Sequence, residues 1–357
     1  MKIPLITSIA DLPPALKASV TPEEKACIKK LSGTNSLPLA VTPHFASLAG
    51  PHPGDPLRRQ FMPSRNEFDP DAFALADPLG EARYRKTSRL VHQYRDRALL
   101  LAGGSCAGYC RFCFRRVRMS GGPGFINRIE IAEACAYLER HSEIREILIS
   151  GGDPLTADNA ALEQLMAALG KARPGMVLRI CTRTPVTWPQ RFSAKTIGLF
   201  AKHKPIRVMV HINHLRELEE EGGVSAGQIL KSLVEAGIPV HVQTVLLKGI
   251  NDSAKTLADL FRACLDLGLS PYYLFQLDLA PGSAHFRVPL KTGLKIYRDL
   301  GSLISGLALP SYAVDLPGGG GKIRLYDNVI VREEERPAGN VYLLADAGGK
   351  LWEYPVN

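Results

Sequence analysis

The segment Gly103-Gly104-Ser105-Cys106-Ala107-Gly108-Tyr109-Cys110-Arg111-Phe112-Cys113 places three cysteines within eight residues. It follows an apolar run, residues 98–102, that has the composition of a buried strand. Three thiols this close in the sequence, directly after a strand, suit a loop that wraps around a ligand. Its glycines permit such a loop. The spacing therefore predicts a metal site directly after a strand.

The number of thiols narrows the kind of metal site. A structural zinc site takes four Cys or His ligands, usually from two paired sets, and the sequence has no second cysteine pair. A cubane iron–sulfur cluster normally takes four thiolates, so three of them leave one iron with an open position. Tyr109 and Phe112 are suited to shielding such a cluster. We therefore expect Cys106, Cys110 and Cys113 to hold an iron–sulfur cluster whose open iron binds a further ligand.

Downstream of this loop, apolar strands alternate with amphipathic helices. Strands are predicted at residues 98–102, 146–150, 177–182, 206–212, 240–246, 272–277 and 311–314, and helices at residues 128–140, 159–172, 194–203, 226–236, 254–267 and 292–305. Continuously apolar strands are typical of a parallel α/β sheet, and catalytic groups of βα barrels follow the strand ends. Six units favour an α/β fold built as a partial (β/α)6 barrel, with a doubly wound sheet as the competing architecture.

The rest of the chain is expected to surround this barrel. Residues 1–89 read as an N-terminal helical extension, residues 90–315 as the barrel, and residues 316–357 as a lysine loop followed by a small C-terminal β appendage. No apolar run approaches the ~20 residues needed to cross a membrane, and the N-terminus lacks the apolar core of a signal peptide. We therefore expect a cytoplasmic protein with no membrane partner.

The charge and the cysteine content argue against a nucleic-acid-binding protein and against a disulfide-stabilised protein. The formal net charge is +9, but the basic residues are scattered and form neither a tail nor a stripe with aromatics, which argues against nucleic acid. Anionic small molecules explain a basic interior equally well. An odd number of cysteines, seven, argues against a disulfide framework. Outside the triplet, Cys135, Cys181 and Cys264 are expected in the core.

A second unusual segment is Asp315-Leu316-Pro317-Gly318-Gly319-Gly320-Gly321-Lys322. Four glycines before a lysine are compatible with a flexible linker. A Walker phosphate loop is excluded, because that motif requires Gly at Leu316 and Ser or Thr at Ile323. The chemical alternative is a lysine presented without neighbouring side chains to a bulky aldehyde cofactor, and pyridoxal phosphate (PLP) fits. Arg and hydroxyl groups of residues 94–97 are available for its phosphate.

The cysteine spacing, with an aromatic before the third Cys, resembles the radical S-adenosylmethionine superfamily. There the open iron binds the amino and carboxylate groups of S-adenosylmethionine. Ser150-Gly151-Gly152-Asp153, at the end of the next strand, resembles the superfamily's Gly-Gly-Glu-type motif, which contacts the methionine amine. The resemblance also implies cofactor contacts from later strand ends, at Arg183, His211 and Gln243.

All these motifs together, over residues 55–322, resemble the lysine 2,3-aminomutase family, PLP-dependent isomerases that convert L-lysine to β-lysine by radical amino migration. The resemblance implies a [4Fe–4S] cluster, S-adenosylmethionine and PLP, and an electron donor such as flavodoxin or ferredoxin. By position, Lys322 is the PLP lysine, with Tyr94 and Arg97 at the PLP phosphate. Arg115 matches the carboxylate-binding arginine. Asp278 and Asp315 match the acid pair that grips the lysine side-chain amine.

The chain departs from the longer family members in one respect. They carry a C-terminal segment whose cysteines bind zinc together with a cysteine that Ser253 replaces here, and no cysteine follows Cys264. We expect this zinc site to be absent, which leaves a homo-oligomer without that link. The shorter length approaches that of bacterial relatives that make β-lysine for elongation factor P. That task, or another amino acid substrate, is the alternative to free lysine metabolism.

Overall fold

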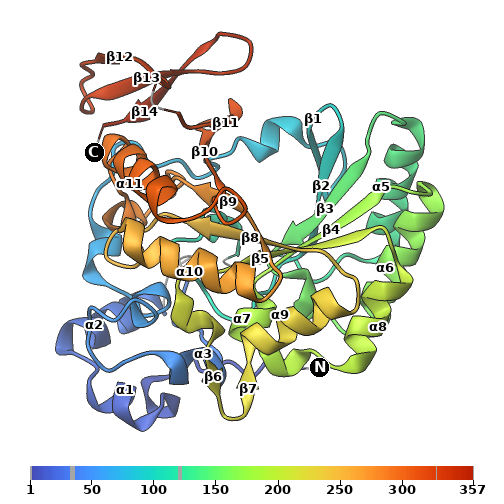
Figure 1. The fold of residues 1–357 in the computed structure, drawn as a ribbon, viewed down its shortest axis with the longest axis horizontal. Helices are drawn as coiled ribbons and strands as arrows, with labels where there is room; N and C mark the ends of the chain where they lie inside the picture. Colours follow the sequence, from blue (N-terminus) through green and yellow to red (C-terminus); the bar gives the residue numbers. More distant parts are fainter. Residues whose placement is uncertain (1, 33–36, 120–122, 327, 357) are drawn as a thin grey trace.

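The computed structural model describes residues 2–32, 37–119, 123–326 and 328–356. Within these ranges the main sheet has nine strands in the order β1-β2-β3-β4-β5-β8-β9-β10-β11 (Figure 1). Their bounds are β1 Leu90–Tyr94, β2 Arg97–Gly103, β3 Glu146–Gly151, β4 Val177–Thr182, β5 Ile206–His211, β8 Val240–Val245, β9 Ser270–Phe275, β10 Ser311–Leu316 and β11 Gly321–Arg324. The strands from β2 to β10 are parallel, whereas β1 and β11 run antiparallel to their neighbours.

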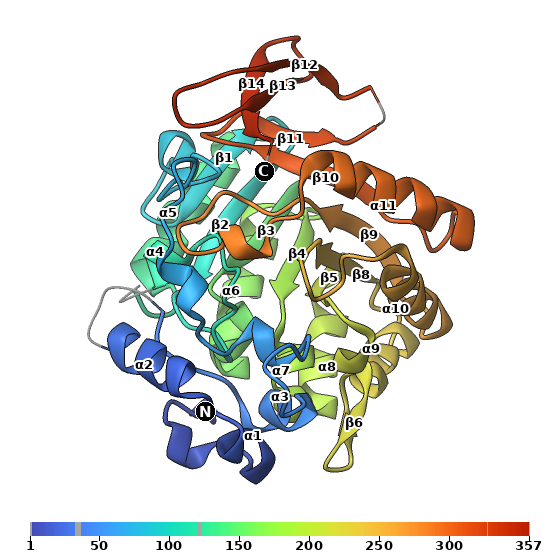
Figure 2. The same ribbon diagram turned by 90° about the vertical axis from the view of Figure 1, so that its left-hand side faces the viewer.

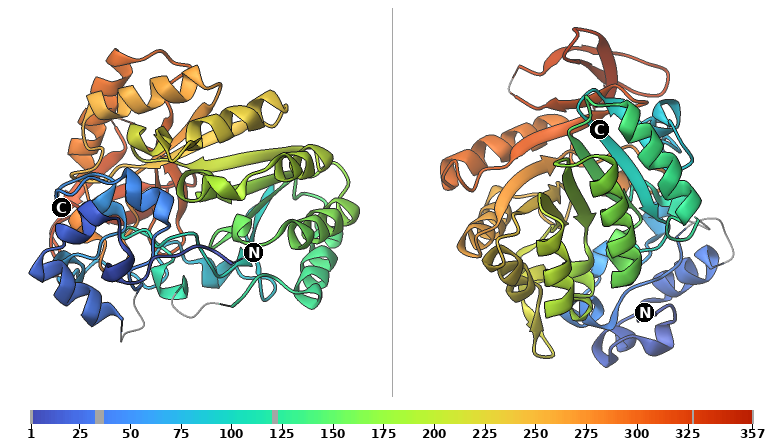
Figure 3. Two further views of the ribbon diagram at one scale, coloured as in Figure 1. Left: turned by 90° about the horizontal axis from the view of Figure 1, so that it is seen from below. Right: turned by 90° about the vertical axis from the view of Figure 1, so that its right-hand side faces the viewer.

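Six helices follow the parallel strands and lie outside them (Figure 3). They are α5 Arg128–Arg140, α6 Asn159–Ala172, α8 Ala194–Lys202, α9 Ala226–Glu235, α10 Ala254–Asp266 and α11 Leu290–Leu303. The first five begin after a polar side chain that accepts a hydrogen bond from the first helical turn, as Asn127 does for α5. The predicted partial (β/α)6 barrel is therefore confirmed, with β10 as a seventh parallel strand.

The barrel differs from the prediction in several details, one of which is that β9 begins and ends two residues before the strand predicted at residues 272–277. Helix α11 begins at Leu290, two residues early, because Pro289 precedes it in place of a polar cap. The strands were expected to be buried on both faces, but burial alternates along β4 and β8. Buried residues along these two strands alternate with residues that are partly exposed.

The N-terminal segment forms short helices against one end of the barrel (Figure 2). They are α1 Pro14–Ala18, α2 Pro22–Leu31 and α3 Pro43–Leu48, followed by the 3-10 turns η2 Arg58–Gln60, η3 Arg65–Phe68 and η4 Glu81–Tyr84. Thr21 caps α2 in a capping box with Glu24. The segment is tied to the cysteine loop, because the backbone N–H of Tyr109 donates to the carbonyl of Ala40 at 2.8 Å.

The C-terminal strands β12 Ile330–Glu334, β13 Val341–Ala345 and β14 Leu351–Pro355 form a separate antiparallel sheet, which is the predicted β appendage. This sheet lies above the β10–β11 edge of the barrel (Figure 2). Tyr354 of β14 is buried, and its hydroxyl donates to the carbonyl of Leu277 at 3.2 Å. The appendage thus supports the end of β9. A short hairpin, β6 Glu220–Glu221 and β7 Val224–Ser225, and the short helices α4 Arg116–Met119 and α7 Thr184–Thr187 complete the described elements.

The first and last strands of the main sheet meet through side chains. The backbone N–H of Lys322 on β11 donates to the hydroxyl oxygen of Tyr94 on β1, at 2.8 Å. Gln93, also on β1, donates to the carbonyl of Gly319 at 3.2 Å. The barrel is therefore nearly closed, and its seam runs beside Lys322. Among the described residues, no helix is long and apolar enough to span a membrane.

Candidate active site

The cysteine loop lies between β2 and α4 and is fixed by buried ion pairs. Arg111, inside the loop, lies 2.5 Å from the carboxylate of Glu67 in η3, and Arg116 lies 2.6 Å from the same carboxylate. Burial alone would raise the pKa of Glu67, but the two guanidinium groups hold it below its usual value. Breaking such a buried pair costs about 3–5 kcal/mol, so the N-terminal segment rigidly anchors the loop.

The three cysteine thiols of the loop are free and close enough to interact through their charges. Burial raises the pKa of Cys106 well above its usual value and that of Cys113 to about 11, with further contributions from the neighbouring thiols. Thiolates so crowded are stable when a cation binds them. Arg183 adds a positive charge, with its Nη1 2.8 Å from the Sγ of Cys110. This donor set fits an iron–sulfur cluster.

Gly151 and Gly152 pack directly on the start of the cysteine loop. The N–H of Gly152 donates to the carbonyl of Gly103 at 2.6 Å, and the N–H of Asp153 donates to that of Ser105 at 2.7 Å. A Cβ on Gly152 would lie 2.3 Å from the Ser105 oxygen, and Gly151 has φ +116° with its Cβ position 2.4 Å from the Gly103 oxygen. Only glycine fits at both positions. The motif thus holds the cysteine loop in place.

Gly152→Ala is expected to destabilise the protein by about 1–3 kcal/mol and to lower its iron content, because the loop backbone must move away from the new methyl group. Thermal unfolding and iron analysis after anaerobic reconstitution check this. The matched control is Gly170→Ala in α6, where a Cβ meets no atom within 4 Å. Alanine there is expected to stabilise by about 0.5–1 kcal/mol. Equal iron content in both variants would contradict the prediction.

The carboxylate of Asp153 links the ends of β3 and β4. It accepts hydrogen bonds from the hydroxyl of Thr182 at 2.7 Å and from the backbone N–H groups of Arg183 and Thr184 at 2.7 and 2.9 Å. Burial raises its pKa. Asp153 therefore positions Arg183, and its direct contact with a cofactor stays a prediction.

Arg183 is the centre of a buried polar network at the ends of β4 and β5. Its Nη2 lies 3.2 Å from the carboxylate of Glu217 and donates to the side-chain oxygen of Gln60 at 2.5 Å. Burial opposes its charge, but Cys110 and Glu217 more than compensate and raise its pKa. Nε2 of His211 donates to the side-chain oxygen of Asn213 at 2.9 Å, and burial together with Arg183 lowers the pKa of His211 to about 3, so its ring is neutral. Gln243 pairs with His211 across β5 and β8.

Lys322 lies on β11 directly opposite Asp315 on β10, where a loop position was expected. Its Nζ is 2.5 Å from the Asp315 carboxylate and 4.0 Å from the ring centre of Phe275. Tyr94 lies next to it, and burial raises the pKa of that phenol to about 12. The guanidinium of Arg97 covers the Tyr94 ring at 3.8 Å. The structure thus brings together the predicted Lys322, Tyr94, Arg97 and Asp315.

Asp278 lies close enough to Arg115, Lys322 and Asp315 to interact with their charges. Burial and then the neighbouring Asp315 raise the pKa of Asp278 to about 8, although Lys322 and Arg115 act in the opposite direction. Arg115 binds Glu81 of η4 through Nε and Nη2, at 3.0 and 2.6 Å, and its Nη1 donates to the Ser150 hydroxyl at 3.3 Å. The predicted substrate residues are therefore close in space.

The glycine run before Lys322 is shaped by its neighbours. The carbonyl of Gly319 accepts a hydrogen bond from the Tyr84 hydroxyl at 2.8 Å, and a Cβ on Gly320 would lie 2.6 Å from both Leu316 and Trp352. Gly318, Gly319 and Gly321 have positive φ. This packing explains the run, so it is not a flexible linker.

Several residues that complete the site are absent from the sequence prediction: Gln60, Glu67, Glu81, Asn213 and Glu217. Glu81 pairs with a residue 34 positions away, and Gln60 with one 123 positions away. No local spacing signals such pairs. Asp77, whose carboxylate accepts a hydrogen bond from the N–H of Glu81 at 3.0 Å, is a turn residue and gives a local sign of η4.

Comparison with known proteins identifies the family. The profile of the Radical SAM superfamily matches residues 101–261. A provisionally named L-lysine 2,3-aminomutase from Treponema pallidum is 44% identical over 288 residues, covering 80% of each chain. The L-lysine 2,3-aminomutase of Clostridium subterminale is 35% identical, over 84% of this chain and 71% of that one. The glutamate 2,3-aminomutase of Clostridioides difficile is 30% identical, over 90% and 79%.

The superfamily profile covers the cysteine loop and the Gly151-Gly152 motif, and it implies a [4Fe–4S] cluster and S-adenosylmethionine. The relatives extend the similarity beyond the barrel core, at identities and coverage that establish common descent. The chain is an enzyme of the isomerase class and belongs to the lysine 2,3-aminomutase family of radical S-adenosylmethionine enzymes.

Proposed function

We propose that the protein is a PLP-dependent L-lysine 2,3-aminomutase that converts L-lysine to β-lysine. The observation that carries the proposal is the convergence of Lys322, Arg115 and two acids, Asp278 and Asp315, beside the barrel seam. One lysine, one arginine and two carboxylates meet the needs of an amino acid that carries an α-carboxylate and a distal ammonium.

The residues around Lys322 fit PLP. Lys322 is the amine that would hold the cofactor aldehyde, and its side chain is 20% exposed, so it is accessible from the barrel interior. Arg97 is one-third exposed and its ion pair is with the exposed Asp96, so its guanidinium is available to a phosphate. Tyr94 supplies a hydroxyl between the two. Phe275 and Tyr273 line the same place with aromatic rings.

When bound, the reduced cluster with S-adenosylmethionine supplies the hydrogen-abstracting radical, and PLP carries the migrating amino group. The chain's own residues orient the substrate for this chemistry. Arg115 is held on its Nε–Nη2 edge by Glu81, which fixes the guanidinium and directs Nη1 toward the substrate carboxylate. The same Nη1 donates to the hydroxyl of Ser150, which directly precedes the Gly151-Gly152 turn at the end of β3.

The acid pair supports lysine over glutamate. The ammonium of Lys322 already lies 2.5 Å from Asp315, and its charge lowers the pKa of Asp278, so the pocket accommodates a cation at this place. A second carboxylate on the substrate would be repelled by both acids. This distinguishes the proposal from the glutamate enzyme of Clostridioides difficile.

The proposed reaction also depends on an electron donor and on the compartment in which the enzyme works. An external one-electron donor such as flavodoxin or ferredoxin would reduce the cluster. All seven cysteines are free, which suits the reducing cytoplasm. Homo-oligomer formation would not depend on the zinc cysteines of the longer relatives, because Ser253 caps α10 here.

The direct test supplies L-lysine, L-glutamate and other amino acids to the anaerobically reconstituted enzyme with dithionite, PLP and S-adenosylmethionine. We expect mass spectrometry and chiral chromatography to detect β-lysine and no β-glutamate. Equal turnover of glutamate would overturn the substrate assignment, and a brown protein that binds no PLP would overturn the aminomutase mechanism. Addition of elongation factor P and its ligase to the product separates supply to that pathway from free lysine metabolism.

A further inference from the structure

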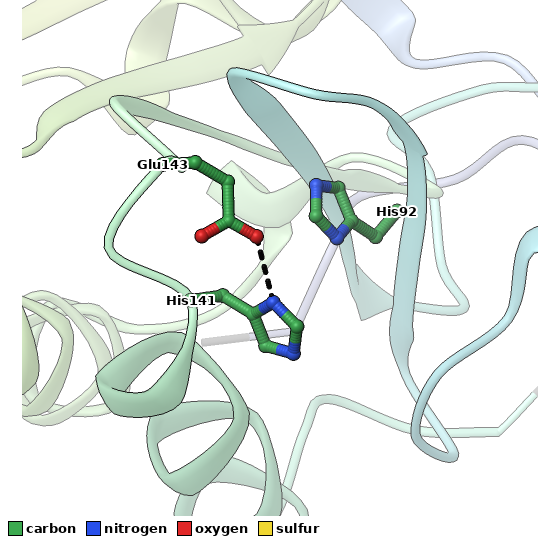
Figure 4. Close-up of side chains that lie close together, drawn as sticks. All are labelled: His92, His141 and Glu143. Atoms are coloured by element: carbon green, nitrogen blue, oxygen red, sulfur yellow. Dashed lines mark hydrogen bonds and ion pairs between the residues drawn. The ribbon is translucent and has the colours of Figure 1, made fainter.

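A second group of metal-ligating side chains lies away from the cysteine loop, between β1 and the end of α5 (Figure 4). His92 is on β1, His141 is the C-cap residue of α5, and Glu143 follows two residues later. One donor atom from each lies within 4.8 Å of the other two. Figure 4 shows all three side chains turned toward one common point. None of the three is assigned to the cluster, S-adenosylmethionine, PLP or the substrate.

The two imidazole rings are held in place by Tyr137, one turn before His141 on α5. The Tyr137 hydroxyl is 2.9 Å from Nδ1 of His92, and its ring stacks on that of His141 at 4.0 Å with an angle of 21°. The backbone of His141 is fixed as well, because Arg173 donates to its carbonyl at 2.5 Å and to that of Ser142 at 2.9 Å. These contacts orient the donors before any ion binds.

We propose that His92, His141 and Glu143 form a binding site for a divalent transition-metal ion of the Zn²⁺ type. Two imidazoles and one carboxylate are ligands that Zn²⁺ prefers, whereas Mg²⁺ and Ca²⁺ require mostly oxygen ligands. His141 Nδ1 and Glu143 Oε1 lie 2.7 Å apart and share a hydrogen bond, so a cation between them would replace the shared proton. Three protein ligands leave further positions to water.

A histidine that binds a metal through one ring nitrogen usually donates a hydrogen bond from the other. His92 has a hydrogen-bond partner for either choice. If Nε2 binds the ion, Nδ1–H donates to Tyr137; if Nδ1 binds it, Nε2–H faces the carbonyl of Arg95 at 3.4 Å. The ion would tie β1, the strand that carries Tyr94, to the end of α5. Occupancy is therefore expected to stabilise the edge strand at the barrel seam, independently of the substrate proposal.

The test is a Zn²⁺ titration of the cluster-loaded enzyme in a metal-free buffer, followed by calorimetry and by metal analysis after gel filtration. Constant iron content shows that Zn²⁺ has not displaced the cluster. We expect one Zn²⁺ per chain, at least about tenfold weaker binding in His92→Ala and His141→Ala, and a smaller loss in Tyr137→Phe. His52→Ala, which removes an exposed histidine elsewhere, is the matched control and is expected to bind as wild type.

A second measurement covers variants whose folding changes. Zn²⁺ is expected to raise the thermal midpoint of the wild type and of His52→Ala, and to leave that of His92→Ala and His141→Ala unchanged, because binding to the folded state stabilises it. Unaltered Zn²⁺ affinity in both His variants would overturn the proposal. So would a midpoint that Zn²⁺ raises equally in all four proteins.

Discussion

Replacing Lys322 by alanine is expected to abolish the visible absorbance of protein-bound PLP and to lower β-lysine formation by about a thousandfold or more, because the amine that would hold the cofactor is lost. Borohydride reduction followed by peptide mass spectrometry should find PLP on the wild-type peptide that contains Lys322 and on no peptide of the variant. Iron content should stay unchanged, because Lys322 contacts none of the three cysteines.

Alanine at this position also removes an ion pair with Asp315, so a second variant separates the two effects. Lys322→Arg keeps a cation opposite Asp315 but cannot bond covalently to an aldehyde. We expect it to fold like the wild type, with equal iron, and to lack bound PLP. Lys291→Ala, at an exposed ion pair with Glu333, is the control. PLP that remains covalently attached in Lys322→Arg would show that another lysine holds it.

Asp278→Asn is expected to reduce kcat/KM for L-lysine by about 100-fold or more, since the substrate ammonium loses one of two charged partners in a largely desolvated pocket. The effect should appear mainly in KM. Asp299→Asn, at an exposed ion pair with Lys295 on α11, is expected to change neither constant. A variant Asp278→Asn that turns over lysine with unchanged KM would refute the role of the acid pair.

The pKa of Asp278 gives this prediction a pH dependence. Burial, followed by repulsion from Asp315, raises that pKa to about 8. Below pH 8 the carboxyl takes up a proton and no longer attracts the ammonium, so KM for lysine should rise by about tenfold per pH unit as the pH falls. The Asn variant should lack this slope between pH 8 and 6.

The raised pKa of Asp278 also makes the stability of the folded enzyme depend on pH. Because the folded pKa of Asp278 exceeds that of an unfolded chain, the folded state holds the proton more tightly between about pH 4 and 8. The free energy of unfolding of the substrate-free enzyme is therefore expected to fall as the pH rises through this window. Thermal unfolding of Asp278→Asn should be less dependent on pH over the same range.

Short-range regularities of the sequence already determine much of this protein. Alternating apolar strands and capped helices predict the barrel, and α5 and α6 begin and end at the predicted residues. The Cys-x-x-x-Cys-x-x-Cys spacing predicts the metal loop, whereas the packing of Gly151 and Gly152 on that loop is seen only in the structure. The predicted features depend on steric and hydrogen-bonding rules that act within a few residues, so they can be predicted from the sequence alone.

The tertiary structure alone decides which distant groups meet. Glu81 reaches Arg115 across 34 positions, and Tyr84 binds Gly319 across 235. Lys322 lies on an edge strand that closes the barrel against Tyr94, rather than on a free loop. Gly320 is glycine because Trp352 packs on it. Such contacts follow from how whole elements pack, and no local spacing encodes them.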